Sequence, residues 1–263
     1  LIYMSKLDKI LSERTSCKSV WFMRQAGRYL PEFRKIRSLN KNFTKLCLDS
    51  DLSSEITLQP IKRFDLDSAI IFSDILMIPY ALGQNVEFFE NLGPKLTEFN
   101  LNIFLDKSEK EFSSKLAPVY KAIKKTRKNL PIEKSLICFI GAPWTLLVYI
   151  LNLKKNKLDL DQNKFNKLNT QANEIINKII DFSCIHIKNQ IEAGADVVQI
   201  FDSWAGLIPD KFINDYCYKP NLQIVNFCKR LKISNICFPK GIKQRYLDFN
   251  DIVKPDGISI DYE

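Results

Sequence analysis

Arg24 and Arg28 stand four residues apart in a segment that also contains Gly27. On a helix the two arginines would share a face, and in a loop Gly27 would let the backbone fold tightly around a ligand. Two guanidinium groups held close together repel each other unless an anion lies between them, and the planar fork of arginine suits a carboxylate. The pair therefore either binds an anion, with Arg37 as a third candidate, or joins Glu32 and other acids in a structural network.

Asp74 is the second candidate for chemistry. It follows Ser73 and an apolar run at residues 69–72, and it precedes Ile75 and Leu76. A carboxylate among bulky apolar side chains costs free energy to bury unless it has a partner. The pattern indicates either a functional carboxylate or the cap of a following helix, which is common after a strand.

The elements that must position these residues alternate along the chain. Short apolar runs rich in β-branched and aromatic residues are typical of parallel strands buried on both faces. They occupy residues 19–23, 69–72, 136–140, 196–201, 236–238 and 257–260. Helical periodicity occupies residues 51–62, 165–193 and 211–231. This alternation predicts βαβ units, and without a glycine-rich dinucleotide fingerprint it favours a (β/α)8 TIM barrel over a doubly wound sheet.

In such a barrel the catalytic residues follow the carboxyl ends of the strands. Polar or aromatic residues do follow the first four predicted strands, namely Arg24 and Arg28, then Ser73 and Asp74, then Trp144 and Tyr149, then Asp202, Ser203 and Trp204. The site is therefore expected on one face, assembled from several loops. A barrel closes with eight strands, whereas about six runs are present. We expect residues 1–263 to form one barrel domain that lacks its C-terminal part.

Composition excludes several classes of protein. The seven cysteines include no C-x-x-C pair, so we expect them to be reduced and mostly buried rather than to form disulfides or a zinc site. No apolar stretch is long enough to span a membrane, and the first residues do not resemble a signal peptide, which predicts a cytoplasmic protein. The net charge of +9 is spread over lysine-rich surfaces, and we interpret it as solvation rather than nucleic-acid binding.

Two further residues are expected to be structural. His186 is the only histidine and lies within the predicted long helix. Ser203 therefore has no histidine beside it in the sequence, which argues against a serine–histidine triad. Trp144 is interpreted as a core aromatic residue.

The segment from Trp21 to Phe33, WFMRQAGRYLPEF, resembles the uroporphyrinogen decarboxylase family. Further matches lie at residues 69–83, 139–149, 194–206 and 238–241, in the family's order. The resemblance implies a (β/α)8 barrel, usually a homodimer, that removes CO2 from the four acetate side chains of uroporphyrinogen III. The product is coproporphyrinogen III in haem biosynthesis, and the reaction uses no metal or organic cofactor. A related family of corrinoid and thiol methyltransferases would need a zinc site of His and Cys, which the sequence does not display.

The resemblance also assigns roles to single residues. Arg24, Arg28 and Arg37 match arginines that hold substrate carboxylates, and Asp74 matches an aspartate that accepts hydrogen bonds from the pyrrole N–H groups. Tyr149 and Ser203 match further positions that contact the substrate. Asp74, Arg24 and Arg28 are thus the expected catalytic residues, while Arg28, Arg24, Tyr149 and a water all remain candidates for the proton donor. The family's histidine, in a Gly-His-Gly context, has no counterpart here, and His186 does not replace it.

Overall fold

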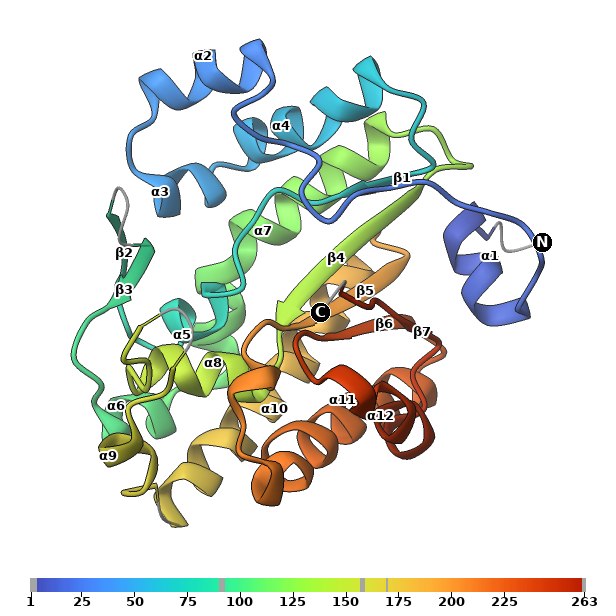
Figure 1. Cartoon of the computed structure of the whole chain (residues 1–263). Helices are drawn as coiled ribbons and strands as arrows, with labels where there is room; N and C mark the ends of the chain where they lie inside the picture. The colour runs from blue at the N-terminus through green and yellow to red at the C-terminus, as the bar shows by residue number, and fades with distance from the viewer. Residues whose placement is uncertain (1–3, 90–92, 157–158, 169, 262–263) are drawn as a thin grey trace.

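A five-stranded parallel sheet forms the centre of the computed structural model, which describes residues 4–89, 93–156, 159–168 and 170–261 (Figure 1). The strand order is β1-β4-β5-β6-β7. The bounds of these strands are Ser68–Ile70 for β1, Ser135–Gly141 for β4, Val197–Asp202 for β5, Ser234–Pro239 for β6 and Gly257–Ile258 for β7. A separate antiparallel hairpin pairs β2 (Val86–Phe89) with β3 (Gly93–Leu96).

Helices connect the strands and cover the sheet. Those before β4 are α1 (Lys6–Glu13), α2 (Pro31–Leu39), α3 (Phe43–Cys47), α4 (Ser50–Arg63), α5 (Met77–Ala81), α6 (Leu101–Asp106) and α7 (Glu109–Asn129). Those after β4 are α8 (Pro143–Ile150), α9 (Gln162–Phe165), α10 (Thr170–Glu192), α11 (Lys219–Arg230) and α12 (Tyr246–Val253). None of the helices in the described part of the chain combines the length and the apolar character that a membrane span requires.

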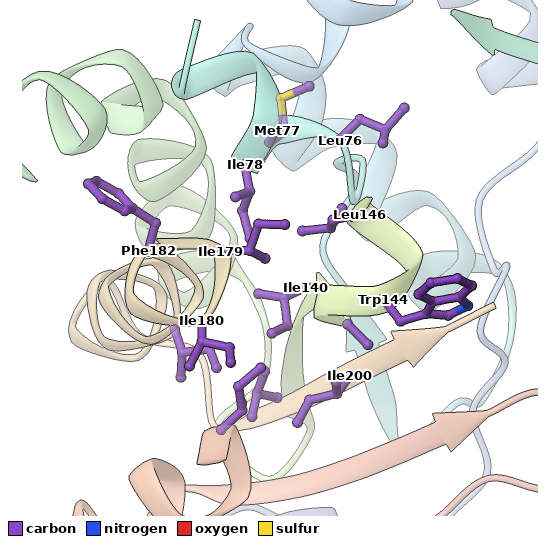
Figure 2. Close-up of a cluster of buried hydrophobic side chains, with 14 of the residues drawn as sticks. Leu76, Met77, Ile78, Ile140, Trp144, Leu146, Ile179, Ile180, Phe182 and Ile200 are labelled. Atoms are coloured by element: carbon purple, nitrogen blue, oxygen red, sulfur yellow. The ribbon is translucent and has the colours of Figure 1, made fainter. Parts of the chain in front are cut away.

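The alternation of side chains along each strand divides the core into two parts. Leu136, Cys138 and Ile140 of β4 point toward the helices and belong to the large core cluster. Figure 2 shows part of this cluster, where Ile140 of β4 lies near Leu146 of α8 and Ile179 of α10. Because the strands are apolar on both faces, they require cover on the second face as well.

Helix α1 supplies some of that cover. Leu7 packs with Ile137, Val197 and Ile236 in a second, smaller core cluster, and Leu11 borders it. Hydrogen bonds near the start of the strands fix the helix. The main-chain N–H of Leu7 donates to Ser135 Oγ at 2.9 Å, and Ser135 Oγ donates to Ser5 Oγ at 2.8 Å. Helix α1 thus lies near the amino ends of the strands, which leaves the carboxyl ends available for a site.

The predicted strand at residues 19–23 is wrong, because this segment runs as extended chain without joining the sheet. Val20 makes one reciprocal contact with Asp67, just before β1. Its N–H donates to Asp67 Oδ2 at 2.7 Å, and its carbonyl accepts from Asp67 N at 2.9 Å. The chain then turns at residues 23–24, so the pairing does not extend into a ladder.

The other five predicted strands correspond to β1, β4, β5, β6 and β7, and the parallel α/β architecture is confirmed. The described strands form an open, barrel-like sheet and do not close a barrel. Two predicted helices are divided. The segment predicted at residues 165–193 contains the end of α9 and the separate α10, and the one at 211–231 begins with 3₁₀ and π turns before α11.

Two glycines allow the loops after β5 and β6 to touch. A side chain at Gly206 would place its Cβ 2.7 Å from the carbonyl oxygen of Gly241, and Gly241 itself has a φ of +79°. The N–H of Gly206 donates to the carbonyl of Lys240 at 2.9 Å in the same contact. Glycine meets both conditions at low cost, namely the missing space for a Cβ at Gly206 and the positive φ at Gly241.

Gly206→Ala is therefore expected to lower the free energy of unfolding by about 1–3 kcal/mol, because the new methyl group forces two backbones apart. Urea denaturation measures the change. Gly27→Ala is the matched control, since a Cβ there lies at an ordinary 3.7 Å from Tyr29. Equal stability of the two variants would contradict the proposed backbone contact.

Candidate functional site

Three of the predicted site residues follow the carboxyl ends of β1, β4 and β5 and therefore lie at the same end of the sheet. Asp74 follows β1, Tyr149 lies in α8 directly after β4, and Ser203 follows β5. Figure 1 shows β4 pointing toward α5 and α8, the two short helices that begin near this end of the sheet. The expectation that the site is assembled from several loops at this end agrees with these positions.

Hydroxyl groups of α4 hold the chain just before Asp74. Ser53 Oγ donates to the carbonyl of Phe72 at 2.6 Å, and the N–H of Phe72 donates to Thr57 Oγ1 at 2.9 Å. Beyond this point, Asp74 Oδ1 accepts from the N–H of Leu76 at 2.8 Å. The chain is therefore held by hydrogen bonds both before and after Asp74, and these bonds fix the position of its carboxylate.

Asp74 caps the turn that leads into α5, but this bond leaves most of its acceptor capacity unused. Among the described residues, Leu76 N–H is the sole hydrogen-bond donor to the carboxylate, and no lysine or arginine forms an ion pair with it. Burial raises its pKa to about 6, although the Leu76 hydrogen bond opposes the rise. A half-buried carboxylate without a cation is suited to binding a positively charged or hydrogen-bond-donating ligand.

The loop that carries Arg24 and Arg28 is fixed by its own backbone and by Gln25. Gln25 Oε1 accepts from the N–H of Phe22 at 3.0 Å, and the hydroxyl of Tyr29 donates to the carbonyl of Gln25. Arg28 also contributes its main chain, because its carbonyl accepts from Arg34 Nη1 at 2.8 Å. The loop therefore has a defined shape while its two predicted site arginines extend from it.

The guanidinium groups of Arg24 and Arg28 are exposed and make no hydrogen bond or ion pair among the described residues. Glu32, the acid that could have joined them in a structural network, pairs instead with Arg63, at 2.9 Å between Arg63 Nη2 and Glu32 Oε2. The alternative of a network with Glu32 is therefore wrong, and both arginines remain available to an anion.

Electrostatic interactions connect the arginines with Asp74. Burial raises the pKa of the Tyr149 phenol, the negative charge of Asp74 adds to the rise, and the positive charge of Arg24 opposes it. In the same way, burial and Asp74 raise the pKa of the buried Cys47 thiol, while Arg37 opposes them. Asp74 thus shares Tyr149 with Arg24 and Cys47 with Arg37 as neighbours within electrostatic range.

Arg37 differs from the other two arginines because it is half-buried at the end of α2. Its Nη1 donates to the carbonyl of Asn40, and its guanidinium lies 5.9 Å from the ring centroid of Phe43. Part of its hydrogen-bonding capacity is therefore used to end the helix, and the rest remains available.

Tyr149 forms an aromatic group with Trp204, a residue that the sequence placed after the fourth predicted strand without assigning it a role. Their ring centroids lie 6.1 Å apart in an edge-to-face arrangement. Lys154 Nζ lies 3.6 Å from the ring centroid of Trp204 and 5.8 Å from that of Tyr149. The lysine adds a positive charge beside the phenol, and no spacing in the sequence could have indicated that contact.

Ser203 is half-buried, and its hydroxyl makes no hydrogen bond among the described residues. Its neighbour Asp202 has a partner on each carboxylate oxygen, because Asp202 Oδ1 accepts from Thr145 Oγ1 at 2.7 Å and Oδ2 accepts from Asn221 Nδ2 at 3.2 Å. Burial raises the pKa of Asp202 to about 6. The position of Asp202 after a strand was evident in the sequence, but its partners on α8 and α11 were not.

His186 and Trp144, which were expected to be structural, are both buried and hydrogen-bonded. His186 is buried, shares a hydrogen bond with the Tyr120 hydroxyl at 3.0 Å, and has its pKa lowered to about 3 by burial. Trp144 is fully buried and donates to the carbonyl of Trp204 at 2.8 Å. The seven cysteines are free, and five of them are buried. No group of three His, Cys, Asp or Glu side chains suited to a metal ion occurs within the described ranges.

A cavity of about 390 Å³ between α2 and α4 does not coincide with this site. Its lining residues are Glu32, Glu55, Gln59, Lys62 and Arg63. None of the predicted site residues lines it.

Comparison with known proteins gives three concordant findings. The family model for uroporphyrinogen decarboxylase matches residues 7–263. A uroporphyrinogen decarboxylase of Orientia tsutsugamushi (strain Ikeda) is 43% identical over 98% of this chain and 77% of its own length. One from Rickettsia bellii is also 43% identical, over 92% of this chain and 72% of its own length.

Among solved structures, a methyltransferase from Methanosarcina mazei superposes with a TM-score of 0.73 at 14% identity. The match covers 96% of this chain and 74% of that protein, and at this identity it supports the fold alone. The family model and the two relatives carry the assignment. The chain belongs to the uroporphyrinogen decarboxylase family.

Proposed function

We propose that this chain removes the acetate carboxyl groups of uroporphyrinogen III as CO2, giving coproporphyrinogen III, with Asp74 at the centre of the site. The family to which it belongs is one of decarboxylases, or carboxy-lyases, in porphyrin biosynthesis. The observation that supports this role for Asp74 is its carboxylate, which is half-buried, has no cation partner among the described residues, and lies within electrostatic range of neighbours shared with Arg24 and Arg37.

The chemistry requires an electron sink. Loss of CO2 from an acetate side chain leaves a carbanion, and protonation of the adjacent pyrrole carbon beforehand makes the ring cationic and able to accept the electron pair. A fixed carboxylate near the ring would stabilise that positive charge, and more strongly in a site shielded from water. Asp74 would first accept hydrogen bonds from the pyrrole N–H groups and then stabilise the cation. Arg28, Arg24, Tyr149 and a water all remain candidates for the proton donor.

The arginines would bind and orient the substrate. Uroporphyrinogen carries eight carboxylates, and the unpaired guanidinium groups of Arg24 and Arg28 are suited to bind them bidentately. Arg37, Tyr149 and Ser203 would contact further carboxylates, and together these contacts place one acetate for reaction. Half-buried Phe139 and Phe201, with ring centroids 5.6 Å apart, offer an apolar surface nearby at the ends of β4 and β5.

We further infer that residues 1–263 belong to one barrel-type domain, that the protein works as a cytoplasmic homodimer, and that neither metal nor organic cofactor takes part. The family resemblance supports the dimer and the cofactor-independent reaction. The free, mostly buried cysteines suit a reducing compartment. Sedimentation equilibrium at micromolar concentration tests the dimer, and a single monomeric species would contradict it.

Asp74→Asn is expected to reduce kcat for CO2 release by at least about 100-fold, the scale of losing one transition-state electrostatic contact. The asparagine can still accept from the Leu76 N–H, so the turn is retained while the charge is lost. The matched control is Asp49→Asn at the N-cap of α4, where Asp49 Oδ1 accepts from Asp51 and Leu52. Turnover close to that of the parent protein in Asp74→Asn would exclude the proposed role.

The pH dependence follows from the raised pKa of Asp74, which is about 6. As the pH falls through this value the carboxyl group gains a proton, and its neutral form cannot stabilise a cation. We therefore expect kcat/KM, which reports ionisations of the free enzyme, to decline on the acid side with an apparent pKa near 6. Asp202 also has a pKa of about 6, so the decline must persist in Asp202→Asn. Its disappearance in that variant would assign it to Asp202 instead.

Arg24→Gln and Arg28→Gln are each expected to raise KM by about 10-fold or more, because a hydrogen bond to a charged group contributes about 1.5–3 kcal/mol. Steady-state kinetics with uroporphyrinogen III measures the change. The control is Arg230→Gln at the end of α11, where the guanidinium lies 5.9 Å from the ring centroid of Phe227. The carboxylate-binding role is refuted if all three variants have the same KM.

A further inference from the structure

The segment Asp202–Trp204 is held on both sides of Ser203, although the Ser203 hydroxyl itself has no partner among the described residues. Thr145 Oγ1 donates to Asp202 Oδ1 at 2.7 Å and accepts from the N–H of Trp204 at 3.2 Å. The carbonyl of Trp204 accepts from Trp144 Nε1 at 2.8 Å. One threonine of α8 thus connects the side chain before Ser203 with the peptide group after it.

The second oxygen of Asp202 and its main chain are also bound. Asn221 Nδ2 donates to Asp202 Oδ2 at 3.2 Å and to the carbonyl of Cys217 at 2.8 Å. The carbonyl of Asp202 accepts from the N–H of Lys240 at 3.1 Å. Asp202, Thr145 and Asn221 are all at most 1% exposed. Helices α8 and α11 therefore converge on the Asp202 carboxylate, and the residue that follows β6 holds its main chain.

The direction of these hydrogen bonds follows from the chemistry of the groups. An ionised carboxylate only accepts, so the Thr145 hydroxyl must donate to Asp202 and use a lone pair for the N–H of Trp204. Burying a carboxylate costs free energy, and an apolar side chain of similar volume would often stabilise a core at least as well. What the carboxylate provides here is a fixed orientation of the hydroxyl, and through it a fixed peptide group beside Ser203.

We propose that Thr145 and Asp202 are positioning residues, which set the conformation of the Ser203 backbone so that the Ser203 hydroxyl donates to a carboxylate of the bound tetrapyrrole. This inference rests on the proposed function for the identity of the ligand, but it concerns only how the ligand is bound. Thr145 and Asp202 act through Ser203 and do not themselves touch the substrate. Removal of the Thr145 hydroxyl should therefore weaken ligand binding only when the Ser203 hydroxyl is present.

The test is a double-mutant cycle with Thr145→Val and Ser203→Ala. Valine keeps the shape of threonine and removes both hydrogen bonds. Thr145→Val should raise KM by about 3–10-fold, the scale of one neutral hydrogen bond, with little change in kcat, and Thr145→Ser should restore most of the affinity. The double variant should have the KM of Ser203→Ala alone.

Thr126→Val is the matched control for the cost of removing a buried hydroxyl. Thr126 is also fully buried, and its Oγ1 donates to the carbonyl of Ala122 at 2.8 Å on α7. Thermal unfolding verifies that each variant is folded. Two results would overturn the proposal. One is a fold-change in KM for the double variant that equals the product of the fold-changes in the two single variants. The other is an unchanged KM in Thr145→Val.

Binding of uroporphyrin III, the oxidised octacarboxylate, provides a second measurement that does not need turnover. Porphyrin fluorescence titration should give the same pattern in Kd, with Thr145→Val ineffective once Ser203 is alanine. If the parent protein binds uroporphyrin with this pattern but releases no CO2 from uroporphyrinogen, the proposed function fails and the positioning role stands. Additive effects on Kd would reject the positioning role whatever the turnover.

Discussion

Hydrogen bonds from helix hydroxyl groups to the ends of parallel strands are the interactions on which this site depends. Ser53 and Thr57 of α4 hold Phe72 after β1, and Thr145 of α8 holds the segment after β5. A strand end that leaves the sheet loses its ladder partners, and its backbone polar groups need new ones. Because rigid helices supply those partners, the loops that carry Asp74 and Ser203 are shaped before any ligand arrives.

This arrangement also determines the electrostatic character of the site. Asp74 and Asp202 have nearly the same pKa, about 6 in each case, and burial is the main cause for both. Their surroundings nevertheless differ. Asp202 accepts from Thr145 and Asn221, whereas Asp74 accepts only from Leu76 among the described residues. Similar pKa values thus accompany one carboxylate with a side-chain partner on each oxygen, which organises the protein, and one with a single main-chain partner, which can bind a ligand.

Much of the fold could be predicted because the strands are apolar on both faces and interrupt helical periodicity clearly. Five of the six predicted strands occur, and the parallel α/β arrangement is confirmed. The prediction failed at residues 19–23, where composition resembles a strand but the backbone contacts Asp67 only once before turning. The β2–β3 hairpin was also missed, since Gly93 and Pro94 obscure the alternation of β3.

For the site, the sequence indicated the candidate residues but not the hydrogen bonds and ion pairs that position them. The spacing of Arg24 and Arg28 left open a structural network, and the structure decided against one with Glu32 by pairing that acid with Arg63. The contacts from Thr145 to Asp202 and from Lys154 to Trp204 join residues 57 and 50 positions apart along the chain, respectively. Such contacts depend on how α8 and its following loop lie against β5, which single-sequence periodicity does not encode. The roles of Asp74, Arg24, Arg28, Arg37, Tyr149 and Ser203 remain predictions.

The contact between Gly206 and Gly241 constrains how the sequence of this chain can evolve. Each glycine lies against the backbone of the other, at distances that leave no room for a methyl group on Gly206. A side chain acquired at Gly206 is therefore tolerated only if the loop after β6 has already shifted away. A substitution that moves the loop after β6 must therefore precede a substitution of Gly206. The two loops, although distant in sequence, are thus expected to evolve together.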